Sequence, residues 1–187
     1  MTPLALFLIA WVGWIVTWMI AALWTGRTEK RLASGSVWVY RAITAVGVVM
    51  FSHWTARALG MRRLWHVGYN GAYLLAALTF AGLLFAWWAR IHLGRLWSSA
   101  ITRKEGHHIV ETGPYALVRH PIYTGLIGAT LATAVAQATA TGIGGFILVT
   151  TGLWLKARSE ERFLGAELGV EAYAGYQRRV PMLLPFL

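Results

Sequence analysis

Seven side chains able to bind a ligand or transfer a proton crowd into the stretch from Gly106 to Gly125 (GHHIVETGPYALVRHPIYTG). They are His107, His108, Glu111, Tyr115, Arg119, His120 and Tyr123. Gly113, Pro114 and Pro121 interrupt this stretch, and the sequence beyond it is apolar. The pattern predicts a polar loop, equipped for binding or catalysis, that leads directly into a membrane span.

The composition is that of an integral-membrane protein. Of the 187 residues, 57% are hydrophobic and 13% are charged. The absence of cysteine excludes disulfides, thiolate metal ligands and a cysteine nucleophile. The net charge of +10 comes from basic residues in short segments between apolar runs, where they orient the chain and face anionic lipid. We therefore expect a membrane partner and no nucleic acid.

Apolar runs predict an all-α membrane protein with about five transmembrane helices. Three runs lie within residues 1–89, and a helical hairpin follows a polar segment. The predicted spans are Pro3 to Trp24, Val37 to Leu59, Val67 to Ala89, Ile122 to Gln137 and Ile143 to Ala157. We expect a single domain over residues 1–187, in which residues 90–187 supply the catalytic loop, the hairpin and a C-terminal helical tail.

Glycines in the hairpin are expected to let its two helices approach each other closely. They are Gly125, Gly128, Gly142, Gly144 and Gly145. The tail from Arg158 onward is amphipathic, with Leu164, Leu168 and Tyr173 at near-helical spacing, and it stops at Val180-Pro181.

The hairpin brings opposite charges together beside the polar loop. Pro121 suits the first turn of a helix, which places Arg119 and His120 at a helix N-terminus that attracts anions. The returning helix then places Glu160 and Glu161 near them. Two adjacent carboxylates need positive neighbours. Either Arg119 and Arg158 pair with them structurally, or the site holds a ligand that carries both charges.

The second interpretation describes an amino-acid-bearing nucleotide. Arg119 and the helix N–H groups suit a carboxylate, and Glu160 and Glu161 suit an ammonium or a sulfonium. A flat ring could contact three aromatic side chains, those of Tyr115, His120 and Tyr123.

Linked motifs in this region resemble the integral-membrane methyltransferases of the isoprenylcysteine carboxyl methyltransferase and phospholipid methyltransferase group. The run from Arg119 to Gly125 matches the pattern R-H-P-x-Y-x-G. Other matching motifs are Ala89 to Arg95, Gly113-Pro114-Tyr115, Glu160-Glu161 with Leu164, Gly169 to Tyr176, and Val180-Pro181 with Pro185. The similarity covers residues 86–187.

This resemblance implies S-adenosylmethionine as cofactor and a lipophilic methyl acceptor, with a carboxylate, amine or thiol head, that arrives from the bilayer. The implied cofactor pocket comprises His107, Val110, Gly113, Tyr115, His120, Pro121, Tyr123, Glu160 and Glu161. Arg119 and Glu161 are candidate catalytic residues, with Glu161 or His120 as a base for an amine or thiol. Arg90 is a third candidate, either orienting an acceptor carboxylate at a lipid-facing edge or snorkelling to the interface.

Other functions remain as alternatives. A membrane reductase of sterol-reductase-like topology would bind a dinucleotide, and a non-catalytic membrane protein would have no use for the long polar loop. His107, His108 and Glu111 could ligate a metal, but they lack a spaced fourth ligand, so we expect none.

The charge distribution generates a prediction about orientation. One set of loops carries most of the Lys and Arg residues, whereas the opposite loop carries Arg57, Arg62 and Arg63. By the positive-inside rule the N-terminus lies outside and the C-terminus lies in the cytoplasm, with a bacterial inner membrane as the expected location. Reporter fusions near Arg63 and at Leu187 should give a cytoplasmic signal only at Leu187. A cytoplasmic signal near Arg63 would contradict the five-span topology.

Overall fold

The computed structural model describes residues 1–32, 35–106 and 108–185. Its main helices are α1 (Pro3–Ala21), α2 (Gly35–Met50), α3 (His53–Ala58), α4 (Tyr69–Leu93), α5 (Pro121–Gln137), α6 (Ala140–Leu168) and α7 (Val170–Arg179). Two short 3-10 helices, η1 (Gly94–Leu96) and η2 (Gly113–Ala116), and two strands, β1 (Thr28–Arg31) and β2 (Thr102–Lys104), lie in the connections.

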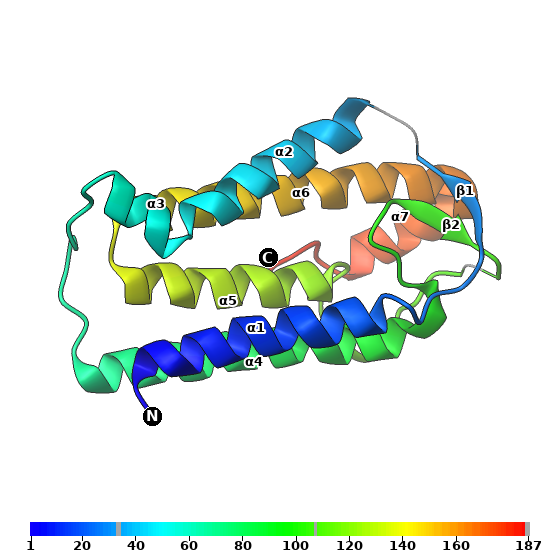
Figure 1. Ribbon diagram of the computed structural model, residues 1–187. Coiled ribbons are helices and arrows are strands. Elements are labelled where there is room, and N and C mark those ends of the chain that lie inside the picture. The colour runs from blue at the N-terminus through cyan, green and yellow to red at the C-terminus, as the bar shows by residue number, and fades with distance from the viewer. Residues whose placement is uncertain (33–34, 107, 186–187) are drawn as a thin grey trace.

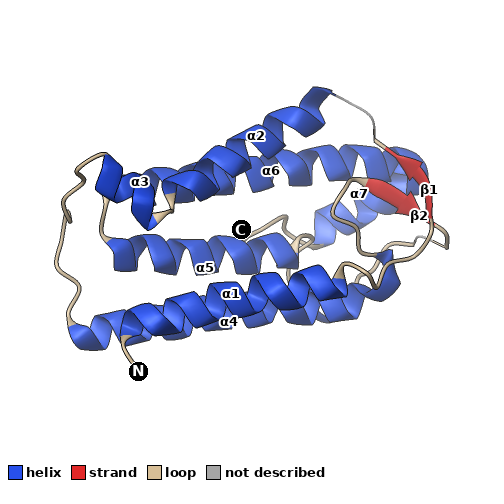
Figure 2. Cartoon of the chain, in the orientation of Figure 1, coloured by secondary structure: helices blue, strands red, loops and turns tan. Residues whose placement is uncertain are grey.

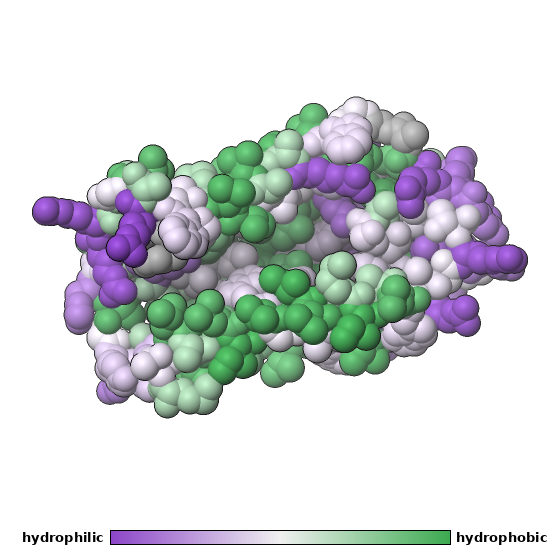
Figure 3. Space-filling model, in the orientation of Figure 1, coloured by the Kyte–Doolittle hydropathy of each residue, from purple (hydrophilic) through white to green (hydrophobic). Residues whose placement is uncertain are grey.

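The long helices run side by side, with α1 next to α4 and α2 next to α6 (Figure 1). In the described chain, α1, α4 with η1, and α6 are each long and apolar enough to cross a membrane. Helices α2 and α5 have 16 and 17 residues, or about 25 Å at 1.5 Å per residue. Hydrophobic residues cover the middle of the visible face and polar residues gather at its ends (Figure 3). The predicted all-α membrane fold is confirmed.

Two predicted spans have different boundaries in the structure. The span expected from Val37 to Leu59 divides into α2 and α3, because the Ser52 hydroxyl accepts from the Thr55 N–H at 3.1 Å and starts a new helix. Gln137 of α5 donates to the Phe51 carbonyl at this break at 2.9 Å. Helix α6 continues without interruption to Leu168, so the first part of the expected tail belongs to the last long helix.

Glycine contacts join helices other than the two predicted. A Cβ on Gly125 of α5 would lie 2.4 Å from the Gly82 carbonyl oxygen of α4. A Cβ on Gly152 of α6 would lie 2.1 Å from the Thr44 hydroxyl and 3.1 Å from the Tyr40 carbonyl oxygen of α2. The expectation that glycines bring α5 and α6 together was therefore wrong for Gly125, and Gly152 was not among the glycines named from the sequence. Small residues instead allow the close approach of α4 to α5 and of α2 to α6.

A two-stranded antiparallel sheet, which the sequence did not predict, ties the first loop to the long polar segment. Thr28 pairs with Lys104 and Arg31 with Thr102, and Figure 2 shows both strands at the end of the bundle beside α7. The buried Lys104 ammonium donates to the Gly26 carbonyl at 3.0 Å and to the Thr28 hydroxyl at 2.8 Å. Burial lowers the pKa of Lys104.

The α4/α5 contact predicts a loss of stability on substitution of one glycine of α5 and none on substitution of another. Gly125→Ala should lower stability by about 1–3 kcal/mol, because the new methyl group overlaps the α4 backbone. Gly128→Ala is the matched control, since a Cβ there meets nothing within 4 Å. Thermal unfolding in detergent measures both. Equal melting temperatures would show that α4 and α5 do not pack as described.

Candidate functional site

One guanidinium group connects several elements at the end of the bundle. Arg119, just before α5, donates from Nε to Glu161 Oε1 of α6 at 2.6 Å. Its Nη1 donates to the carbonyl of Gln177 in α7 at 3.0 Å and to the carbonyl of Val180. The Arg119 and Glu161 side chains are 10% and 7% exposed, so the pair is largely withdrawn from solvent. Gln177 also donates to Glu161, from Nε2 to Oε2, at 2.9 Å.

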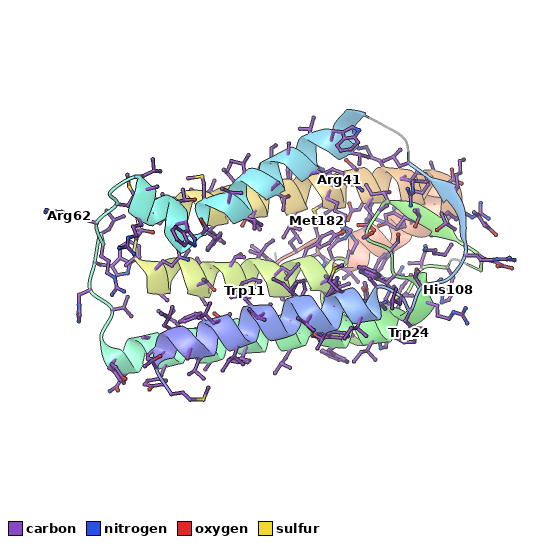
Figure 4. All side chains as sticks on the ribbon, in the orientation of Figure 1. Trp11, Trp24, Arg41, Arg62, His108 and Met182 are labelled. Carbon is purple, nitrogen blue, oxygen red and sulfur yellow. The ribbon has the colours of Figure 1, made fainter. Side chains whose placement is uncertain are left out.

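The C-terminal segment after α7 covers the start of α5. The Arg119 N–H donates to the Pro181 carbonyl at 2.8 Å, and the His120 N–H donates to the Met182 carbonyl at 3.1 Å. Figure 4 shows Met182 in the space between the helices, where the Thr124 hydroxyl also donates to the Leu183 carbonyl at 2.6 Å. The chain's own carbonyls thus accept from these two N–H groups, which lie at the N-cap of α5 and just before it, so neither is free for an anion.

Glu160, His120 and Tyr123 form a second polar group beside the ion pair. The Tyr123 hydroxyl donates to Glu160 Oε2 at 2.7 Å. The His120 ring stacks on Tyr123, with centroids 5.3 Å apart and an interplanar angle of 4°. Its Nε2 lies 3.2 Å from Glu161 Oε1, and its Nδ1 lies 3.9 Å from Glu160 Oε2. The imidazole thus lies between the two adjacent carboxylates.

Arg158 does not help to neutralise these glutamates within the described structure. Its guanidinium lies 5.0 Å from the centre of the Trp154 ring, on the exposed side of α6. Residues four apart share one face of a helix, so Arg158 and Trp154 point outward together. Glu161 instead shares the buried side with Ala157.

A cavity opens next to this polar group, lined from α4, the polar loop, α5, α6 and α7. Six of the predicted residues line it: Val110, Tyr115, Arg119, His120, Tyr123 and Glu160. Further lining residues were not assigned to the site from the sequence, and they include His108, Leu93, Trp97, Ile109, Leu164, Tyr173 and Tyr176. Glu160 is therefore the member of the glutamate pair that faces the cavity, and Glu161 lies behind it.

Two further predicted pocket residues, Gly113 and Pro121, do not line the cavity. Gly113 has a φ of +58°, and a Cβ there would lie 2.7 Å from His92 Cε1, so the turn needs glycine to bring His92 close. Pro121 is fully buried in the first turn of α5. His107 lies outside the described residues. The first two shape the backbone around the cavity and do not line it.

Burial keeps the tyrosines of the loop and α7 neutral. It raises the pKa of Tyr115, Tyr173 and Tyr176 well above the usual value for a phenol. The Tyr176 hydroxyl donates to the Tyr115 carbonyl at 2.7 Å and fastens α7 to η2. These phenols can offer ring faces and neutral hydrogen bonds to a ligand, but no phenolate base.

Arg90 lies deep in the protein and not at a lipid-facing edge, so its predicted placement was wrong. It is 1% exposed and donates to the carbonyls of Ala21 and Trp24 at 2.7 Å and of Gly94 at 2.8 Å. Its guanidinium also lies 4.5 Å from the centre of the Trp97 ring. Carbonyls at a helix end need donors, and Arg90 supplies them where α1 and α4 end.

The described fold and site define an integral-membrane protein with an aromatic cavity and a buried ion pair at one end of its helical bundle. Residues 74–166 match the model of the isoprenylcysteine carboxyl methyltransferase (ICMT) family. The match runs from α4 through Glu160 and Glu161, so the chain belongs to this family over those residues. The resemblance predicted from the motifs is confirmed.

A second comparison finds a bacterial relative. The chain is 31% identical over 127 residues to the cobalt-zinc-cadmium resistance protein CzcN of Cupriavidus metallidurans. The aligned part covers 65% of this chain and 56% of the relative, so the chain spans little more than half the length of that curated protein.

The two glutamates are expected to differ in their effect on stability. Glu161→Gln leaves the Arg119 guanidinium buried without its counter-charge, which typically costs about 3–5 kcal/mol. Glu160→Gln keeps an acceptor for the Tyr123 hydroxyl and should cost less than about 1.5 kcal/mol. Thermal unfolding of both variants in one detergent gives the comparison. Equal losses would contradict the distinction between a structural Glu161 and a cavity-facing Glu160.

Proposed function

We propose that this protein is a membrane methyltransferase that uses S-adenosylmethionine and methylates a lipophilic acceptor. The observation that carries the proposal is the Glu160 carboxylate, held by Tyr123 at the wall of an aromatic cavity. A carboxylate that faces an aromatic cavity suits a ligand with a positive charge and a flat ring. The family match over residues 74–166 supports the same chemistry.

The cavity residues fit the parts of this cofactor unequally. Glu160 suits the sulfonium or the ammonium, and the rings of Tyr115, His120 and Tyr123 suit the adenine. The cofactor carboxylate has a smaller choice of partners, because Nε and Nη1 of Arg119 already bond to the protein. Within the described residues, Nη2 is the nitrogen of the Arg119 guanidinium that remains to bind the cofactor carboxylate. When bound, the cofactor supplies an electrophilic methyl group.

Methyl transfer is an in-line displacement that depends on position and on the exclusion of water. Helix α7 and residues 180–183 cover the polar group and keep it in place through the Arg119 bonds. A carboxylate acceptor needs no general base. For an amine or thiol, His120 is the better base, because it lines the cavity while Glu161 is engaged by Arg119 and Gln177. Glu161 then acts as a positioning residue.

The acceptor reaches the site laterally, from lipid, in this proposal. The visible face of the molecule is hollowed between α2 and α1, with hydrophobic residues along both sides (Figure 3). An acceptor with a long apolar part would partition there, at about 0.8 kcal/mol per buried methylene. The cavity end of the bundle also holds the basic loops, which favours a cytoplasmic location for it.

Metal resistance is what the name of the relative states, and it is not proposed for this chain. Within the described residues, no group of three or more His, Cys, Asp or Glu side chains could hold a metal ion. A reductase would bind a dinucleotide, and the family match favours methyl transfer over it. Both alternatives are decided by which ligand the protein binds.

Calorimetric titration with S-adenosylhomocysteine tests the cofactor assignment. The folded protein should bind it, and Glu160→Gln should bind at least about tenfold more weakly, because a hydrogen bond or contact to a charged group is worth about 1.5–3 kcal/mol. Glu171→Gln, on the exposed side of α7, is the control and should bind like the unaltered protein. Tight binding of a dinucleotide with no binding of S-adenosylhomocysteine would favour the reductase.

A transfer assay tests the acceptor class. Membranes incubated with the protein and methyl-labelled S-adenosylmethionine should yield label in the organic extract, and the rate should rise with the chain length of added acceptors. Label confined to water-soluble products, at a rate independent of chain length, would refute lateral entry while leaving methyl transfer intact.

A further inference from the structure

Two arginines line a second cavity at the same end of the bundle. Arg31 ends β1, and Arg41 lies on α2 nearly two turns from the start of that helix. Apolar side chains from the first loop and α2 complete one wall, and Ala100 and Ile101 of the polar segment form the other. Within the described residues, neither arginine forms an ion pair.

Positive charge accumulates beside this cavity. The Arg41 guanidinium lies 5.6 Å from the centre of the Trp38 ring and repels the Lys156 ammonium of α6, which the Glu160 carboxylate attracts more strongly. Lys156 donates to the Ser99 carbonyl at 3.1 Å, so a neutral oxygen is its hydrogen-bond partner. Arg31 and Arg41 are exposed, and two guanidinium groups beside apolar side chains favour the binding of an anion.

The second cavity lies between the lipid-facing side of the protein and the proposed methyl-transfer site. Ala100 belongs to the walls of both cavities. Figure 3 shows the visible face of the protein hollowed between α2, which carries Arg41, and α1. Trp38 and Val39 of α2 are exposed, as expected of side chains that face lipid.

We propose that the cavity of Arg31 and Arg41 binds the acidic head group of an amphiphile, a phosphate or a carboxylate, whose chain lies in the hollow between α2 and α1. Guanidinium groups hold such oxyanions with paired hydrogen bonds. The apolar surround and the position beside lipid select an amphiphile over a small soluble anion. The chain would share the hollow proposed for the methyl acceptor, but the binding requires neither the cofactor nor methyl transfer, so its test does not depend on the proposed function.

The test measures the melting temperature of the full chain in a neutral detergent with three probes. Short-chain phosphatidylglycerol should raise it in a saturable way, whereas short-chain phosphatidylcholine and inorganic phosphate should have little effect. Arg41→Gln should raise the half-saturating concentration of phosphatidylglycerol about tenfold or more. Arg62→Gln, at the opposite end of the bundle (Figure 4), should leave it unchanged. If Arg41→Gln does not fold, Arg31→Gln provides the same comparison.

Three results would overturn the proposal. They are an equal response to phosphatidylcholine, a full response to inorganic phosphate alone, and an equal loss of affinity in Arg62→Gln. The first would show that the acidic head group is not needed for binding. The second would show that the apolar chain is not needed, and the third would show only a general attraction of anions to a basic protein.

Discussion

The buried ion pair between Arg119 and Glu161 is the interaction on which the rest of the site depends. Withdrawing two charges from water is costly, and it is tolerated here because both groups have further hydrogen-bond partners. Arg119 also bonds to carbonyls of Gln177 and Val180, and Glu161 also accepts from Gln177. One pair thus fixes the start of α5, the end of α6, and α7 with the segment that follows it.

This arrangement gives two neighbouring glutamates different tasks. Because Glu161 is engaged behind the cavity wall, its charge holds the structure together. Glu160 accepts from Tyr123 and lines the cavity, where a positive ligand can approach. The helix contacts at Gly125 and Gly152 also shape the site, because they allow α5 to pack closely on α4 and α6 to pack closely on α2. The space between these two helix pairs then remains for the C-terminal segment and for ligands.

The sequence predicted the membrane class and the meeting of Arg119, His120 and the glutamates, because hydropathy and hairpin geometry are local properties of the chain. It also predicted the family, because the motif from Arg119 to Gly125 is contiguous. It did not predict the environment of Arg90, since a buried arginine and a snorkelling one look alike in sequence. The role of residues 180–183 at the start of α5 was missed for a similar reason, because backbone hydrogen bonds between distant segments leave no side-chain pattern. The glycines indicated close packing, but the sequence assigned Gly125 to the wrong partner helix, because neighbours in the chain need not be neighbours in the bundle.

A structure determined in lipid with S-adenosylhomocysteine bound would test the central claim most directly. The account predicts the ligand in the cavity between Tyr115, Tyr123 and Glu160, with the bond from Arg119 to Glu161 intact. A ligand bound elsewhere, or Arg119 released from Glu161 to hold it, would contradict the account.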